Sequence, residues 1–143
     1  LPKGPTIAGV ELLANVGLPA EIAAARERGA DGIGLLRTEF FYMQQSRWPT
    51  VAEQVAFYRR ALQQGPKGPV VLRLLDAGGD KALPYAPEHA EPNPILGLRS
   101  VRYLLSLPEV AKAQVRAVAE AAAAEKADVR VLVPLVTAAW ELR

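Results

Sequence analysis

The chain has 143 residues, a net charge of +2 and 22% charged residues, which suits a single domain of about 100–200 residues. It contains no cysteine, so disulfides, thiolate metal sites and cysteine nucleophiles are excluded within this sequence. No clustered basic stripe indicates nucleic-acid binding, and no apolar run approaches the roughly 18 residues of a membrane span. These features fit a cytoplasmic protein.

Strand-like and helix-like segments alternate along the sequence. Four short apolar runs predict buried strands, over residues 10–14, 33–36, 70–75 and 129–136. Apolar residues at helical spacing predict helices over residues 19–28, 51–64, 96–105 and 108–126. The second of these helices has a capping box, Thr50 with Glu53, at its start. Pro134 suits the exit of a parallel strand better than a central antiparallel one.

The remaining segments are read as connections. Residues 40–48 predict an aromatic-rich loop, with local packing or a partner surface as its role. Residues 77–94 predict a loop longer than the usual limit of about 12–15 residues, which is typical of functional or disordered segments. Asn15 and Gly17 predict a turn after the first strand. Residues 138–143 read as the start of a helix without a terminator, so we expect a fragment of a longer protein.

Alternation of strands and helices predicts a parallel sheet wrapped by helices. A complete (β/α)₈ barrel needs eight such units and typically about 250 residues. We therefore expect an α/β fold, the first half of a (β/α)₈ barrel with about four units, as one partial domain over residues 1–143. A small doubly wound sheet is the alternative, although no Gly-rich phosphate-binding turn follows the first strand.

Two arginines, Arg37 and Arg73, stand at matching places, each at the end of an apolar run. Because the carboxyl ends of parallel strands meet at one rim, we expect both guanidinium groups there. A guanidinium binds phosphate or carboxylate through two parallel hydrogen bonds. The pair therefore predicts a receptor for a small di- or trianion, and surface ion pairing is the plainer alternative.

Acidic residues follow both arginines. Glu39, Asp76 and Asp80 are candidates to orient the guanidinium groups or, alternatively, to bind a divalent cation. Lys81 is either part of the same site or a solvated ion-pair partner of Asp80. The single histidine, His89, is expected to be exposed in a polar loop.

Residues 32–41, Gly-Ile-Gly-Leu-Leu-Arg-Thr-Glu-Phe-Phe, resemble the phosphoenolpyruvate (PEP)-utilising enzymes. The Arg-Thr-Glu motif alone is shared with pyruvate phosphate dikinase and PEP synthase. Two further motifs, Asp-x-Gly-Gly-Asp-Lys and Asn-Pro-x-Leu-Gly-x-Arg, favour PEP–protein phosphotransferases, the Enzyme I family of the bacterial sugar phosphotransferase system. The segments that resemble this family cover residues 10–17, 32–41, 72–84, 91–102 and 131–136.

The resemblance implies a (β/α)₈ domain that binds PEP and Mg²⁺ and works as a homodimer. The phosphoryl group passes to a histidine on a separate N-terminal domain and then to a histidine phosphocarrier protein, for sugar uptake. The family's substrate-binding arginines fall on Arg37, Arg73 and Arg99. Its metal ligands, a further substrate-binding arginine and a cysteine that acts as an acid are expected beyond Arg143. Its phosphorylated histidine is expected before Leu1.

The resemblance therefore places no catalytic residue and no metal ligand on this sequence, and we expect the isolated chain to be inactive. The alternatives are a domain of the PEP synthase or pyruvate phosphate dikinase type, or a non-catalytic interaction module. The module interpretation depends on the open strand edges of a half-barrel, which recruit partners and predict dimerisation or aggregation.

Overall fold

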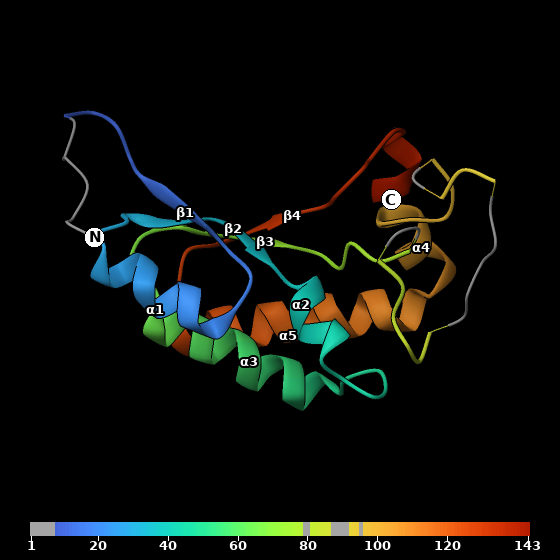
Figure 1. The fold of residues 1–143 in the computed structure, drawn as a ribbon, viewed down its shortest axis with the longest axis horizontal. Helices are drawn as coiled ribbons and strands as arrows, with labels where there is room; N and C mark the ends of the chain where they lie inside the picture. Colours follow the sequence, from blue (N-terminus) through green and yellow to red (C-terminus); the bar gives the residue numbers. More distant parts are fainter. Residues whose placement is uncertain (1–7, 79–80, 87–91, 95) are drawn as a thin grey trace.

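The computed structural model contains one four-stranded parallel sheet with helices between its strands (Figure 1). The structure describes residues 8–78, 81–86, 92–94 and 96–143. The strands of this part are β1 (Leu13–Val16), β2 (Gly32–Arg37), β3 (Val70–Arg73) and β4 (Val129–Leu132). The helices are α1 (Pro19–Glu27), α2 (Glu39–Met43), α3 (Val51–Gln64), α4 (Val101–Ser106), α5 (Pro108–Glu125) and the 3₁₀ helix η1 (Ala139–Leu142).

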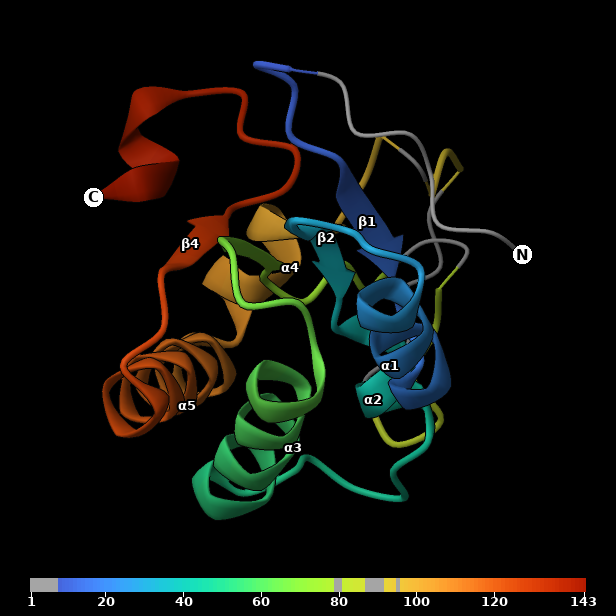
Figure 2. The same cartoon turned by 90° about the vertical axis from the view of Figure 1, so that its left-hand side faces the viewer.

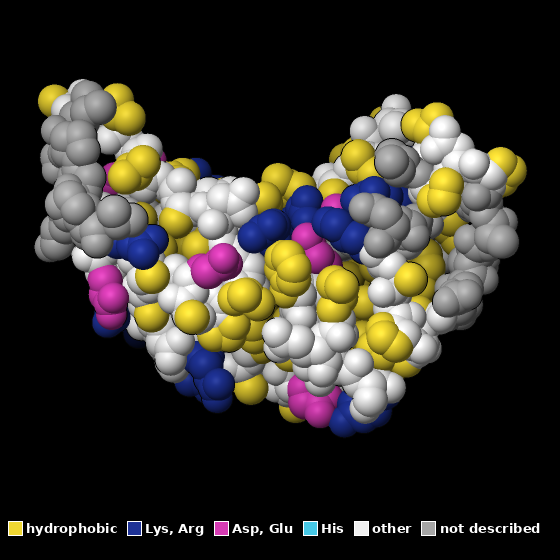
Figure 3. Space-filling view, in the orientation of Figure 1, with side chains coloured by type: hydrophobic (Ala, Val, Ile, Leu, Met, Phe, Trp, Pro, Cys, Tyr) yellow, Lys and Arg dark blue, Asp and Glu magenta, His cyan; other side chains and the backbone are white. Residues whose placement is uncertain are grey.

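The strands lie in the order in which they occur in the chain, β1-β2-β3-β4, and every neighbouring pair is parallel. The crossover helices α1, α3 and α5 all lie on one face of this sheet (Figures 1 and 2). A doubly wound sheet carries helices on both faces, so that alternative does not fit. The opposite side of the molecule is hollowed (Figure 3). An α/β fold with a parallel sheet is thus confirmed.

Two hydrophobic clusters hold the fold together. The first lies between the sheet and the helices α1, α3 and α5, and includes Ile22, Ile33 and Tyr58. The second lies beyond the carboxyl ends of the strands and includes Tyr42, Leu75 and Leu104. The second cluster packs α2 and α4 against the segment that follows β3, and this packing supports the carboxyl ends of the strands.

The predicted first strand is misplaced, because β1 begins at Leu13 and ends at Val16. Val10 and Leu12 are 59% and 54% exposed, so the apolar run does not mark a buried strand. Pairing with β2 sets the boundary instead, with Leu13 opposite Gly32. Asn15, predicted in the turn, lies inside the strand as a result.

The prediction of a loop over residues 40–48 is wrong in its first half. The short helix α2 forms there, with the amides of Phe41 and Tyr42 donating to the carbonyl oxygen of Thr38 at 3.0 and 3.4 Å. Tyr42 is fully buried in the second cluster, and the Phe41 ring stacks on Phe57 of α3. These aromatic side chains serve local packing, one of the two roles expected of them.

Three other boundaries differ from the predictions. The helix expected from residue 96 begins at Val101, because Ser100 has a φ of +55°, outside the helical region. The strands β3 and β4 end at Arg73 and Leu132, two and four residues early. Leu135 has a φ of +56°, which no continuing strand accommodates. The helices predicted at 19–28, 51–64 and 108–126 are confirmed, as is the Thr50–Glu53 capping box.

Candidate functional site

Arg37 and Arg73 are the last residues of the neighbouring parallel strands β2 and β3, and they are register partners. Both strands therefore deliver an arginine at the same level of the same rim, as the sequence predicts. Fixed positions matter here because an anion gains most from guanidinium groups that are already oriented.

Arg73 is held from two sides. One of its terminal nitrogens pairs with Oε1 of Glu39, and the other lies 3.3 Å from Oδ2 of Asp76. The Glu39 side chain is 2% exposed, so it is a buried carboxylate held in place by α2. The Nε atom of Arg73 is buried without a hydrogen-bond partner among the described residues.

Asp76 is the hub of the cluster. Its Oδ1 accepts from Nε of Arg99 at 3.2 Å and from the hydroxyl of Ser100, while its Oδ2 lies 3.4 Å from Nζ of Lys81. Burial opposes ionisation of this carboxyl group, but the hydrogen bonds from Arg99 and Ser100 and the charges of Arg73 and Lys81 outweigh it. Together they lower the pKa of Asp76 to about 2, so the group is a carboxylate at neutral pH.

Lys81 joins the two carboxylates. Its Nζ atom lies 3.1 Å from Oε1 of Glu39 and 3.4 Å from Oδ2 of Asp76. The structure thus brings together five of the predicted residues in one network: Glu39, Arg73, Asp76, Lys81 and Arg99. Asp80 and His89 lie outside the described residues.

Arg37 differs from the other cations of the rim. Its guanidinium carbon lies 4.8 Å from the centroid of the Phe40 ring, and its Nε is buried without a hydrogen-bond partner among the described residues. A cation over an aromatic face is stabilised without being neutralised. Arg37 also has an acidic neighbour outside the network: hydrogen bonds from the amides of Gly17 and Leu18, with a smaller contribution from the charge of Arg37, lower the pKa of Glu21.

Gly17 makes room for this arrangement. A Cβ atom at this position would lie 2.5 Å from Cδ2 of Phe40 and 3.3 Å from Nε of Arg37. Any side chain there would displace the ring or the guanidinium group. The sequence indicated a turn at Gly17 and packing by Phe40, but gave no sign that the two residues support Arg37.

The rim carries more positive than negative charge. In the described part of the site, four basic side chains (Arg37, Arg73, Lys81 and Arg99) lie near three carboxylates: Glu39 and Asp76 in the network, and Glu21 beside Arg37. Figure 3 shows lysine or arginine and acidic side chains gathered together in the hollow of the molecule. This charge balance, with donors fixed at a strand rim, suits a small polyanion.

For the two described acidic candidates, Glu39 and Asp76, the alternative of a divalent-cation site does not fit. Both carboxylates hold basic side chains, which a cation would have to displace. Within the described ranges, no group of three or more histidine, aspartate, glutamate or cysteine residues is placed to hold a metal ion. Glu39 and Asp76 are thus paired with basic side chains, the contact that an orienting role requires, and Asp80 lies outside the described residues.

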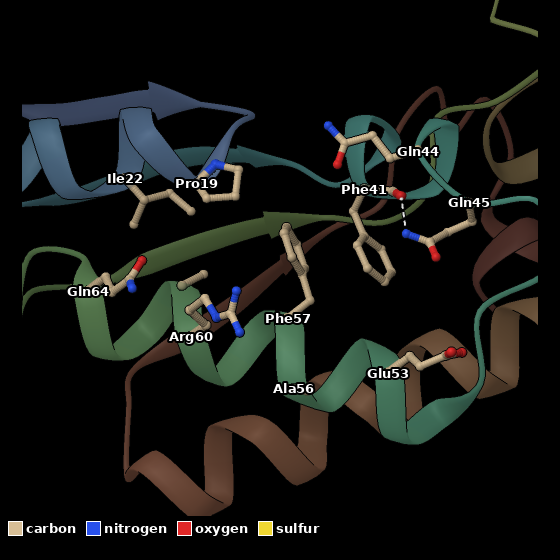
Figure 4. A pocket seen from close by; sticks show the side chains of 11 residues that line it. Pro19, Ile22, Phe41, Gln44, Gln45, Glu53, Ala56, Phe57, Arg60 and Gln64 are labelled. Atoms are coloured by element: carbon tan, nitrogen blue, oxygen red, sulfur yellow. Dashed lines mark hydrogen bonds between the residues drawn. The ribbon is translucent and has the colours of Figure 1, made fainter.

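A separate pocket lies on the helical side of the molecule, between α1, α2 and α3 (Figure 4). Pro19, Ile22 and Phe57 form apolar walls, and the amide of Gln45 donates to the carbonyl oxygen of Phe41 at 3.1 Å. None of the predicted anion-binding residues lines it. The pocket is therefore distinct from the arginine cluster.

Comparison with known proteins identifies the family of the chain. Residues 5–143 match the family described as "PEP-utilising enzyme, PEP-binding domain". A phosphoenolpyruvate-protein phosphotransferase from Streptomyces coelicolor is 45% identical over 89% of this chain and 23% of its own length. One from Haloferax volcanii is 43% identical over 94% of this chain and 24% of its own length.

A "multiphosphoryl transfer protein" from Rhodobacter capsulatus is 40% identical over 94% of this chain and 16% of its own length. The chain thus spans about a quarter or less of the length of these relatives. The family match covers nearly every residue of the chain. The chain belongs to the family of PEP-binding domains of PEP-utilising enzymes.

Proposed function

We propose that this chain forms part of the PEP-binding domain of a PEP–protein phosphotransferase, which transfers the phosphoryl group of PEP to a protein histidine. The observation that carries the proposal is the register pairing of Arg37 with Arg73 at one rim of the sheet. The names of the relatives support the phosphotransferase over a PEP synthase or pyruvate phosphate dikinase. We also expect the isolated chain to be inactive.

PEP carries a phosphate and a carboxylate on a three-carbon frame, so it needs several cations within a short distance. Arg37 lies over the Phe40 ring and outside the ion pairs of Glu39 and Asp76, which suits it to the most highly charged group of the ligand. Arg73 and Arg99 are anchored by Glu39 and Asp76 and offer donors in fixed directions. Phosphoryl transfer depends mainly on positioning and on neutralisation of charge, and these side chains provide both.

The parent protein is proposed in more detail from the family resemblance. The sequential sheet, with its crossover helices on one face, supports the first half of a (β/α)₈ barrel. The parent would act as a cytoplasmic homodimer with an N-terminal phosphohistidine domain and a histidine phosphocarrier protein as partner, in sugar uptake. In the described segments, no helix is both long and apolar enough to cross a bilayer.

Mg²⁺ belongs to the proposal only through the parent. Because Glu39 and Asp76 are engaged with arginine and lysine, the described residues do not fit a magnesium site. We expect its ligands beyond residue 143. Arg37, Arg73 and Arg99 bind and orient PEP.

Isothermal titration calorimetry of the chain with PEP tests the proposal. Arg37→Ala and Arg73→Ala are each expected to weaken binding at least about tenfold, because each removes a charge-assisted bidentate contact. Arg59→Ala is the matched control, since Arg59 is exposed on α3 and pairs with Glu125 far from the rim. Binding that survives both rim substitutions would overturn the assignment.

A further inference from the structure

Gln114 of α5 is a fully buried amide directly beneath the arginine rim. It is 0% exposed and belongs to the longest helix on the covered face of the sheet. A buried amide is costly unless its donors and its acceptor are satisfied. The sequence predicts a helix over residues 108–126 but does not indicate that Gln114 is buried.

The Gln114 side chain contacts three separate parts of the chain. Its Oε1 accepts from the backbone amide of Leu75 at 2.9 Å. Its Nε2 donates to the hydroxyl of Thr38 at 3.2 Å and to the hydroxyl of Tyr58 at 3.1 Å. Both donors and the acceptor of the amide are therefore used, in a site from which water is excluded.

Two of these partners, Thr38 and Leu75, lie just beyond the ends of β2 and β3, the strands that end in Arg37 and Arg73. The Thr38 hydroxyl, which accepts from Gln114, donates in turn to the carbonyl oxygen of Arg73 at 2.8 Å. Thr38 lies between Arg37 and Glu39, and Leu75 directly precedes Asp76. The Gln114 amide thus links the segment after β2, which carries Glu39, to the segment after β3, which carries Asp76.

We propose that Gln114 is a positioning residue for anion binding, which fixes the ends of β2 and β3 so that Arg37 and Arg73 stay at a matched height and spacing. The inference rests on the proposed function. Gln114 touches neither arginine side chain and acts through the hydrogen-bonded chain Gln114–Thr38–Arg73 and through the amide of Leu75. A shift of about 1 Å at a site of this kind costs up to about 100-fold in function.

The test compares two buried substitutions on the same helix. Gln114→Met keeps the length of the side chain and removes its hydrogen bonds, and it is expected to weaken PEP binding about tenfold in calorimetry. Val118→Ala, one turn along α5 and also buried, removes apolar packing and no hydrogen bond, because a valine side chain makes none. It is expected to destabilise the fold while leaving the dissociation constant within about twofold of the wild type.

Thr38→Val and Thr38→Ser complete the experiment and remain informative if Gln114→Met does not fold. Thr38→Val removes the hydroxyl group that connects Gln114 to the carbonyl oxygen of Arg73. Thr38→Ser keeps this hydroxyl group and is expected to retain PEP affinity. The double variant Gln114→Met/Thr38→Val is expected to bind no more weakly than the weaker single variant, because both changes break one linkage. The Arg73 side-chain Nε resonance is expected to move in Gln114→Met without ligand and to stay unchanged in Val118→Ala.

The outcomes separate the two levels of the proposal. If Arg73→Ala abolishes binding while Gln114→Met and Thr38→Val bind PEP as tightly as Val118→Ala, the positioning role is wrong and the anion site stands. If PEP binding is insensitive to both Arg37→Ala and Arg73→Ala, the proposed function itself falls.

Discussion

Replacement of Asp76 by asparagine provides a direct test of the charge network. The carboxylate has an ordinary pKa of 3.8, and its environment lowers the pKa to about 2 in the folded chain. Since one pKa unit corresponds to about 1.4 kcal/mol, ionised Asp76 contributes about 2–3 kcal/mol to stability at neutral pH. The side chain is only 6% exposed, so solvent screening reduces this value little.

The sign of the pH dependence follows from the direction of the shift. Between pH 4 and pH 2 the unfolded chain binds a proton at Asp76 more readily than the folded chain. The contribution of Asp76 is therefore complete above pH of about 4 and is lost as the pH falls toward 2. Asp76→Asn has no such group, so its stability difference from the wild type should shrink over this interval.

Urea unfolding of the wild type and Asp76→Asn at pH 7, 4 and 2.5 measures this difference. Asp128→Asn is the matched control, because Asp128 is 56% exposed and pairs with Arg130 on the surface. We expect a loss of about 2–3 kcal/mol for Asp76→Asn at pH 7 and less than about 1 kcal/mol for the control. A loss at Asp76 that equals the control, or that does not change with pH, would refute the reasoning.

Three further substitutions test other parts of the account. Glu39→Gln removes the charge that faces Arg73 and Lys81 and is expected to cost about 1–3 kcal/mol in urea unfolding, whereas Glu109→Gln in an exposed pair should cost under about 0.5 kcal/mol; equal losses would contradict the network. Gly17→Ala is expected to push the Phe40 ring from under its guanidinium partner and to weaken PEP binding about tenfold in calorimetry, so an unchanged affinity would argue against this support. Tyr42→Phe removes the hydroxyl group that donates to Oε1 of buried Gln54 at 2.8 Å, and it is expected to lower the free energy of unfolding by about 1–3 kcal/mol. PEP affinity is expected to stay unchanged, and a loss of affinity would show that the packing around Tyr42 affects the anion-binding residues.

The arginine rim could be predicted from the sequence because it follows from topology alone. Two parallel strands joined by one helix must present their carboxyl ends at one edge, so Arg37 and Arg73 were expected to be neighbours before any coordinates were known. Glu39 and Asp76 stand close to these arginines in sequence, which made their pairing predictable as well. An acidic residue two or three positions after an arginine can be recognised in the sequence without knowledge of the fold.

The supporting residues could not be found in this way. Gln114 lies 39 and 76 positions from its partners Leu75 and Thr38, and nothing near it in the sequence marks a buried amide. The sequence did not predict α2, because no side chain caps this helix. It is stabilised by burial of Tyr42 among residues that are distant in sequence, such as Leu75 and Leu104. The start of β1 was misplaced because strand pairing, not the apolar run, selects Leu13.

The most direct test of the central claim is a nuclear magnetic resonance titration of the isotope-labelled chain with PEP. We expect the largest shifts at the ends of β2 and β3, including the side-chain Nε groups of Arg37 and Arg73. Shifts concentrated instead around Phe57 and Gln45, in the pocket between α1, α2 and α3, would contradict it.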